Sequence, residues 1–481
     1  MWTQGKDRIQ MSEHRAQIFT PSLTLPPRGG GLGGGAVFCI LYSVFCVLCF
    51  LLSSAFADDL KLQDLVNEAL KNNPEILAYK AKESAARFRI PQTKSLPDPM
   101  FMMGYMNEGT KDLYTFGEDM GADSQWMFSL SQMLPFPGKL SLKEEMASRE
   151  ARSIKASSDS IRLKIVAKVK EFFYDLFFTY KNLDLVKDKG ALFSRIEDAA
   201  IARYSSGMTS QQEVIMAQTE KYMLLEKEEM LKQKIQALEA MLNSLTGKDI
   251  NSPLGKPHEI SPTLFMHDIN ELLSMAYENS PEIKAKEEII AAAEVKVQMA
   301  KKEYYPDFTI NANYFAKSAD FQDMWSLSTS INIPIFYKTK QQQAVLEAEA
   351  LLAEAKSELN ATRLMVSSAI KDNYSMLKTS EQLMKLYKNG LIPKSYQDFE
   401  LALAGYVAGG IEAITVISRL KSFLDFELLY WQQLIEREKA IARLDAITAV
   451  NNDQTSASPR TELGPNGSVE PSTVISQEIK K

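Results

Sequence analysis

The chain has 481 residues, of which 45% are hydrophobic and 24% are charged, and its formal net charge is −6. These values are ordinary for an ordered protein and exclude disorder as the overall state of the chain. The acidic balance disfavours nucleic acid as a partner. At this length, either several domains or one elongated architecture is expected.

The first 57 residues are typical of a secretory targeting segment. The apolar run from Ala36 to Leu52 is followed by Ala55-Phe56-Ala57, which predicts cleavage after Ala57. All three cysteines lie in this segment, so the mature chain would have no disulfide and no cysteine-ligated metal. Its removal takes away four basic and two acidic residues, and the net charge falls from −6 to −8. No later apolar run reaches the roughly 18 residues of a membrane-spanning helix.

The rest of the chain consists of two copies of one unit. Asp64 to Ile76 reads DLVNEALKNNPEI, and 207 residues later Glu271 to Ile283 reads ELLSMAYENSPEI. After Val450 the sequence has no apolar period, which predicts a disordered tail. The expected organisation is a targeting segment (1–57), a first repeat (58–247), a linker (248–265), a second repeat (266–450) and a tail (451–481).

Each unit begins with a helix that is interrupted at Asn73-Pro74 or at Ser280-Pro281, where a capping residue followed by proline restarts it. Two alternating segments follow, with one apolar face and one small, polar face. They are best seen in the second copy, from Phe308 to Tyr314 and from Trp325 to Ile333.

Two long helical stretches complete each unit. In the first copy, Lys139 to Tyr204 would form a rod on the order of 100 Å long if unbroken. Its apolar residues follow the four-three spacing of a coiled coil: Ile165, Val169, Phe172, Leu176 and Leu183. Gly207 and Gly409 lie where these stretches must reverse, which predicts that each YxxG sequence is the tip of a helical hairpin.

Four strands per chain are too few to close a barrel, and open strand edges are not tolerated in lipid. Several chains that each contribute four strands to a shared barrel would satisfy both conditions. The long antiparallel helices would then form a tube of coiled coils continuous with that barrel.

With its doubled NPEI/SPEI helices, paired strand hairpins and two YxxG tips, the chain resembles the TolC-type outer-membrane efflux family from about Leu60 to Val450. The segment Leu130 to Lys139 further resembles the heavy-metal branch. The resemblance implies a mainly α-helical homotrimer with a 12-stranded β-barrel in outer-membrane lipid and a periplasmic helical tunnel. A periplasmic adaptor, bound to an inner-membrane pump of the resistance-nodulation-division (RND) type, would dock at the tips. Such a channel exports its substrate, here heavy-metal cations, and is not an enzyme.

The resemblance also implies which residues form the docking and gating tips. They are Tyr204, Ser206, Gly207 and Glu213 in the first tip, and Tyr406, Ala408, Gly409 and Glu412 in the second. The family's basic residue two positions after the second tip glycine is replaced here by Ile411. Three copies of Glu213 or Glu412 could form an acidic ring that concentrates cations. Alternatively, both are solvated carboxylates favoured by a helix start.

The stretch LPDPMFMMGYMN, from Leu96 to Asn107, is rich in methionine. Its counterpart in the second copy, YYPDFTINANYF, has none, so the strand itself does not require sulfur. Alternation places Met100, Met102 and Met106 on the lumen face of the barrel. Three symmetry copies could not meet on one ion across a barrel about 25 Å wide, so no closed metal site is expected, only transient contacts along the wall.

Other functions find little support in the sequence. His258 in the linker and His267 just after it are isolated histidines, and no catalytic, cofactor-binding or metal-binding motif is present. Within the channel class, drug or organic-solute efflux and type I protein secretion are the alternatives. A periplasmic coiled-coil adaptor or structural protein would explain the rods but not four alternating strands, two of which begin near tryptophan.

Overall fold

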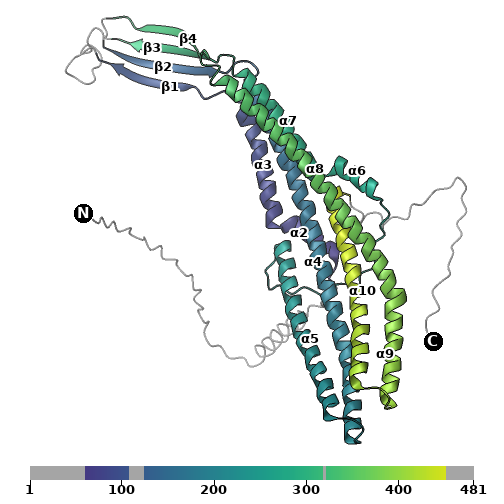
Figure 1. Cartoon of the computed structure of the whole chain (residues 1–481). Helices are drawn as coiled ribbons and strands as arrows, with labels where there is room; N and C mark the ends of the chain where they lie inside the picture. Colours follow the sequence, from purple (N-terminus) through teal and green to yellow (C-terminus); the bar gives the residue numbers. More distant parts are fainter. Residues whose placement is uncertain (1–59, 108–123, 318–320, 451–481) are drawn as a thin grey trace, which may run out of the picture. The chain divides into compact units, whose positions relative to one another are not determined.

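Both halves of the chain fold into the same succession of elements in the computed structural model, which describes residues 60–107, 124–317 and 321–450 (Figure 1). The first half contains α2 (Leu62–Asn72), α3 (Pro74–Lys94), β1 (Met100–Met106), β2 (Gln125–Leu134), α4 (Lys139–Ser205) and α5 (Gln211–Thr246). The second contains α6 (Ile269–Asn279), α7 (Pro281–Lys302), β3 (Phe308–Ala316), β4 (Met324–Ile331), α8 (Gln341–Leu386), the π-helix η2 (Tyr387–Leu391), α9 (Ile392–Val407) and α10 (Ala413–Thr448). The expected targeting segment and tail lie outside the described residues.

The predicted breaks before the prolines are confirmed. The Asn73 side chain accepts hydrogen bonds from the backbone N–H groups of Glu75 (2.9 Å) and Ile76 (3.1 Å), and so caps α3. Pro74 occupies the first turn, where its missing N–H costs nothing. In the second half, α7 likewise begins at a proline, but the capping Ser280 makes no side-chain hydrogen bond.

The long rod is also confirmed, because α4 runs for 67 residues without a break. It packs against α3 and α7 near the strands and against α5 and α10 farther along. Four residues of the predicted seam are buried, whereas Phe172 is partly exposed at the edge of the same cluster. Phe173 and Phe177 fill the core of this cluster, so these aromatic side chains contribute to the packing between helices.

The second rod differs from the first because it contains a π-helical turn, η2, between α8 and α9. Pro393 lies in the first turn of α9, directly after this turn. A proline inside a helix lacks an N–H and collides with the carbonyl four residues earlier, and a wider π turn relieves both problems. This π-helical turn was not predicted from the sequence.

The four strands form one antiparallel sheet in the order β1-β2-β3-β4, which leaves β1 and β4 as its edges. The central pair, β2 with β3, joins the two halves of the chain through pairs such as Leu130 with Ala312. Tyr105 lies opposite Trp126, and Tyr314 lies opposite Trp325. Aligning the two hairpins by these aromatic pairs shifts β3 relative to β1 by two residues from the 207-residue offset of the repeat. Because side chains alternate with a period of two, this shift leaves every side chain on its expected face of the sheet.

A buried lysine ties the strands to the rods. Lys139, the first residue of α4, is 3% exposed. Its ammonium group lies 2.9 Å from Asp307 Oδ1 and 3.2 Å from Glu303 Oε2, and it donates a hydrogen bond of 3.1 Å to the carbonyl oxygen of Tyr305. Asp307 also accepts a hydrogen bond from the backbone N–H of Phe136 (2.8 Å). The two strand-to-helix junctions are thus held together by charge-assisted hydrogen bonds.

The middle of the molecule contains two further local constraints. Gly247 ends α5 with φ +72°, and a Cβ there would lie 2.7 Å from the carbonyl oxygen of Asn72. The Tyr180 hydroxyl donates a hydrogen bond of 3.0 Å to Glu239. Burial, together with the Glu239 carboxylate, raises the pKa of Tyr180 to about 12.

Candidate functional site

Each long helical pair reverses at a glycine in the left-handed conformation. Gly207 follows α4 with φ +72°, and Gly409 follows α9 with φ +86°. Both turns have the same backbone hydrogen bonds: Met208 N–H donates to Arg203 O (2.9 Å), and Gly410 N–H donates to Gly405 O (3.0 Å). The predicted hairpin tips are therefore confirmed. Because α4 runs continuously from beside β2 to the first tip, the tips lie at the end of the helices away from the sheet (Figure 1).

Tyr406 connects the two tips. Its side chain is fully buried, in a cluster formed by α4, α9 and α10. Its hydroxyl donates a 3.4 Å hydrogen bond to Glu213 Oε2 in the first turn of α5. Arg203, near the end of α4, places its guanidinium 4.5 Å from the centre of the Tyr406 ring. One tyrosine thus contacts an acid and a base that both come from the other hairpin.

Arg203 also closes the second tip with backbone contacts. Its Nη1 donates hydrogen bonds to the carbonyl oxygens of Tyr406 (3.0 Å) and Ile411 (3.4 Å). Ile411 occupies the position where the family resemblance implies a basic residue. In this chain, a cation from the first tip reaches that position instead.

Arg203 was not among the tip residues predicted from the sequence. A difference between the two copies could have indicated it: the residue before the tip tyrosine is Arg203 in the first copy and Gly405 in the second. A Cβ at Gly405 would lie 2.5 Å from Ile411 Cδ1, so the Ile411 side chain would have to shift to admit a side chain there.

The electrostatics of this network keep the Tyr406 phenol protonated. Burial raises the pKa of Tyr406 above its ordinary value, the negative charge of Glu213 raises it further, and Arg203 partly opposes the change. The phenol therefore remains a hydrogen-bond donor to Glu213 at neutral pH.

The other tip residues selected from the sequence are not joined into this network. Tyr204 is 47% exposed, although it occupies the same position in the first tip as Tyr406 in the second. Exposed positions at the two turns are Ser206, Gly207, Ala408 and Gly409. Glu412 is exposed and caps the start of α10 without a side-chain hydrogen bond. Both carboxylates, Glu213 and Glu412, thus lie at helix starts.

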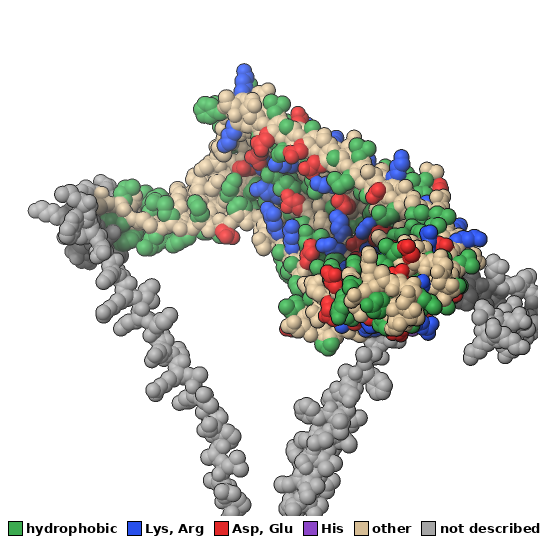
Figure 2. All heavy atoms as spheres, turned by 60° about the horizontal axis from the view of Figure 1, so that its bottom comes forward, with side chains coloured by type: hydrophobic (Ala, Val, Ile, Leu, Met, Phe, Trp, Pro, Cys, Tyr) green, Lys and Arg blue, Asp and Glu red, His purple; other side chains and the backbone are tan. Residues whose placement is uncertain are grey.

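The sheet has one apolar and one polar face. Large exposed side chains cover the apolar face, including Phe101 (68% exposed), Trp325 (77%) and Leu327 (67%). On the polar face, Asn313 Nδ2 donates to Ser326 Oγ (3.1 Å). The register places Met100, Met102 and Met106 on this polar face. Figure 2 shows hydrophobic side chains over much of the strand region, whereas acidic and basic side chains intermix over the helices.

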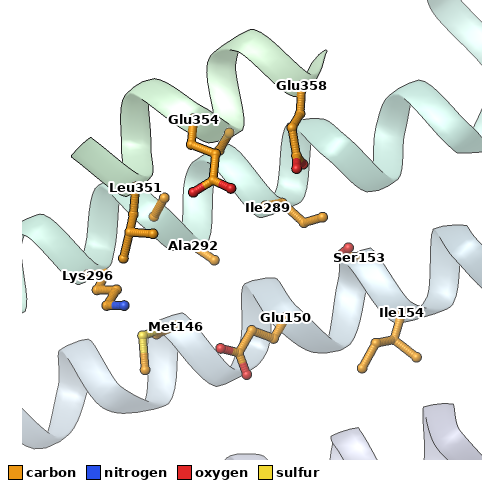
Figure 3. A pocket seen from close by; sticks show the side chains of 12 residues that line it. Met146, Glu150, Ser153, Ile154, Ile289, Ala292, Lys296, Leu351, Glu354 and Glu358 are labelled. Carbon is orange, nitrogen blue, oxygen red and sulfur yellow. The ribbon is translucent and has the colours of Figure 1, made fainter. Parts of the chain in front are cut away.

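A groove of about 470 Å³ between α4, α7 and α8 contains the carboxylates of Glu150, Glu354 and Glu358 (Figure 3). Two of them are ion-paired: Glu358 with Lys286 at 2.8 Å, and Glu150 with Arg89 at 3.5 Å.

Within the described parts of the chain, no group of three or more His, Cys, Asp or Glu residues could hold a metal ion. No helix in those parts is long and apolar enough to cross a bilayer.

Comparison with known proteins relates this arrangement to a family. Residues 272–446 match the profile described as Outer membrane efflux protein. The cobalt-zinc-cadmium resistance protein CzcC of Cupriavidus metallidurans is 22% identical over 398 residues, which cover 81% of this chain and 90% of that protein. The probable outer membrane lipoprotein SilC of Salmonella typhimurium is 21% identical over 353 residues, or 68% and 74% of the two chains.

A solved structure shares the fold. The crystal structure of CusC, described for the conformational changes that accompany folding and transmembrane channel formation, matches with a TM-score of 0.71 at 15% identity. The match covers 82% of this chain and 93% of that one.

Proposed function

Because the chain belongs to the outer membrane efflux protein family, we propose that it is the exit channel of a tripartite efflux system. The protein is located in the outer membrane, extends into the periplasm and is not an enzyme. The observation that carries the proposal is the joining, in one chain, of an open-edged sheet to a 67-residue helix that ends at a tip.

The open edges of the sheet support a trimer. The outer edges of β1 and β4 carry backbone groups that lipid cannot satisfy. Pairing β4 of one copy with β1 of the next satisfies them and closes a barrel of twelve strands from three copies. With strands about 4.8 Å apart and tilted by roughly 40°, that barrel is on the order of 25 Å across. The apolar face then meets lipid, and the polar face lines the duct.

Neighbouring residues on β4 offer a matched test of this orientation. Leu327 belongs to the apolar face and Ser328 to the polar face, and both are exposed. A charge on the lipid side of a barrel is destabilising, whereas one on the lumen side is tolerated. We therefore expect Leu327→Asp to reduce outer-membrane insertion and Ser328→Asp to leave it unchanged, as measured by membrane fractionation. Equal insertion of both variants would contradict the proposed barrel.

We further propose that the paired tips dock a periplasmic adaptor, which connects the channel to an inner-membrane pump of the RND type. The exposed turns at Ser206 and Ala408 support this docking because their backbones are accessible there. All three cysteines of the chain lie in the predicted targeting segment, so after its cleavage Ser206→Cys and Ala408→Cys would each supply a single thiol. Crosslinks to the adaptor in cells are expected at one site or both, and none at either would refute docking.

Heavy-metal cations are the substrate class that we propose. Similarity to a protein named for cobalt-zinc-cadmium resistance supports this choice. Deletion of the gene should lower tolerance to copper, silver, cobalt, zinc or cadmium, and a plasmid copy should restore it. A loss confined to organic antibiotics would instead identify a drug or organic-solute channel. Unchanged tolerance to every compound, with a secreted protein retained in the cell, would identify type I secretion.

A further inference from the structure

We propose that Met102, Met106 and Met127 form a thioether contact point around Gly104 for a soft monovalent cation of the Cu(I) or Ag(I) class. The cluster belongs to one protomer and therefore does not need symmetry copies to meet across the barrel. Its position on the duct wall rests on the proposed channel function, whereas cation binding by the purified protein does not.

The register of the first hairpin brings the three methionines together. Gly104 lies opposite Met127, while Met102 and Met106 occupy the positions two residues before and after Gly104 on the same face. Met127 is therefore the diagonal neighbour of both, at a separation of roughly 7–8 Å that long side chains can bridge. Met127 was not predicted from the sequence as a partner of the β1 methionines, because alternation along one strand does not reveal which residue lies opposite on the next.

Gly104 supplies the space at the centre of the cluster. A Cβ at this position would lie only 3.3 Å from Met127 Cε, so the tip of the Met127 side chain reaches over the glycine. Gln125 Nε2 lies 3.6 Å from the Met106 sulfur, so that sulfur reaches across to β2. Both thioethers thus extend across the β1–β2 pair.

The surroundings favour a soft ion over a hard one. None of the residues in β1, β2, β3 or β4 is charged, so no carboxylate on these strands could attract Mg²⁺ or Ca²⁺. Thioethers are soft, neutral ligands that suit Cu(I), and Ag(I) has the same preference. Met102 (51% exposed) and Met106 (54%) remain accessible from the polar face, so they do not fill a core.

The second hairpin shows that the fold does not require these methionines. Aligned by the aromatic pairs, Asn313 and Ser326 occupy the positions of Gly104 and Met127. They make a direct hydrogen bond of 3.1 Å in place of the glycine and thioether. A soft-ligand cluster in one hairpin and an amide–hydroxyl pair in the other is a chemical difference that strand pairing alone does not explain.

The test uses purified, detergent-solubilised trimer, with Ag(I) as an air-stable probe and Zn(II) as a harder control ion, both measured by titration calorimetry. Wild-type protein should bind Ag(I) and not Zn(II) at this cluster. A triple variant changes Met102, Met106 and Met127 to leucine, which preserves the apolar volume of the side chains. It should bind Ag(I) at least about tenfold more weakly, because loss of even an outer-shell partner of a metal site lowers metal affinity by about that factor. Met103→Leu, on the opposite face, is the matched control and should bind as wild type does.

A second variant keeps all three sulfurs. Gly104→Asn copies Asn313 of the second hairpin, so the strand should tolerate it, but its side chain would displace the tip of Met127. Weakened Ag(I) binding is expected here as well. Wild-type affinity in both the triple variant and Gly104→Asn would overturn the cluster, even if gene deletion still abolished metal tolerance. Binding that is lost in these variants while deletion leaves metal tolerance unchanged would support the cluster and refute only the proposed substrate.

Discussion

Removing the Tyr406 hydroxyl should weaken the connection between the two tips without changing their packing. Tyr406→Phe retains the buried ring beside the Arg203 guanidinium, and loses the hydroxyl that donates a hydrogen bond to Glu213. A hydrogen bond to a charged acceptor contributes about 1.5–3 kcal/mol, but the 3.4 Å separation is long for a hydroxyl donor. We therefore expect a loss of about 1 kcal/mol per protomer.

The family resemblance implies a trimer whose tips open. If the hydrogen bond to Glu213 breaks when they open, and the three protomers open in one concerted step, three such losses sum to about 3 kcal/mol, a shift of roughly a hundredfold toward the open tip. The assay is conductance of purified trimer in planar lipid bilayers, where the open fraction of Tyr406→Phe should rise accordingly. Tyr204→Phe is the matched control, because Tyr204 is 47% exposed in the equivalent position of the first tip. Its conductance should equal that of the wild type.

Arg203→Gln should open the tip further than Tyr406→Phe does. It removes the cation–π contact, worth about 0.5–2 kcal/mol, together with two hydrogen bonds to carbonyl oxygens of the second tip. If both variants conduct as wild type does while remaining folded trimers, the Arg203–Tyr406–Glu213 network does not hold the tips together and the reasoning is refuted.

Three further predictions concern stability, measured by urea unfolding of the purified protein and followed by helical circular dichroism. Lys139→Met should cost about 2–3 kcal/mol, because it leaves Asp307 partly buried without its cation; the loss is below that of a fully buried pair since Asp307 retains 17% side-chain exposure. An unchanged midpoint would show that the junction is not held by charge. Gly247 and Gly409 both have positive φ, so replacing either with alanine should destabilise the protein. Gly247→Ala should cost about 2 kcal/mol or more because its Cβ also meets the Asn72 carbonyl, whereas Gly409→Ala should cost only about 1 kcal/mol because nothing lies within 4 Å of a Cβ there. Equal losses would contradict the steric argument. The pKa of Tyr180 is raised to about 12, so the unfolded state releases the phenol proton at a lower pH than the folded state does. The contribution of Tyr180 to the free energy of unfolding is therefore complete below pH 10 and is lost as the pH rises toward 12. Tyr180→Phe should flatten this decline, and an unaltered pH profile would show that another group causes it.

The local features of the chain could be predicted from sequence because each depends on nearby residues. Proline after Asn73 or Ser280 restarts a helix whatever surrounds it, and glycine at 207 and 409 is needed where φ is positive. Alternation of side chains likewise assigns each methionine of β1 to a face, because a strand has a period of two. The family resemblance rests on these same local patterns, repeated twice.

Other features depend on residues far apart in the chain, and only the tertiary structure decided them. Pairing of β2 with β3 brings the two halves into one sheet, and antiparallel packing of the rods brings Arg203 to Tyr406, although 203 positions separate them. Met127 lies over Gly104 because of strand register, which no single strand reveals. The sequence by itself thus determined the elements, their repeat and their faces, since these follow from local backbone preferences and periodicity. The structure determined which side chains share a site, since that depends on how distant elements pack.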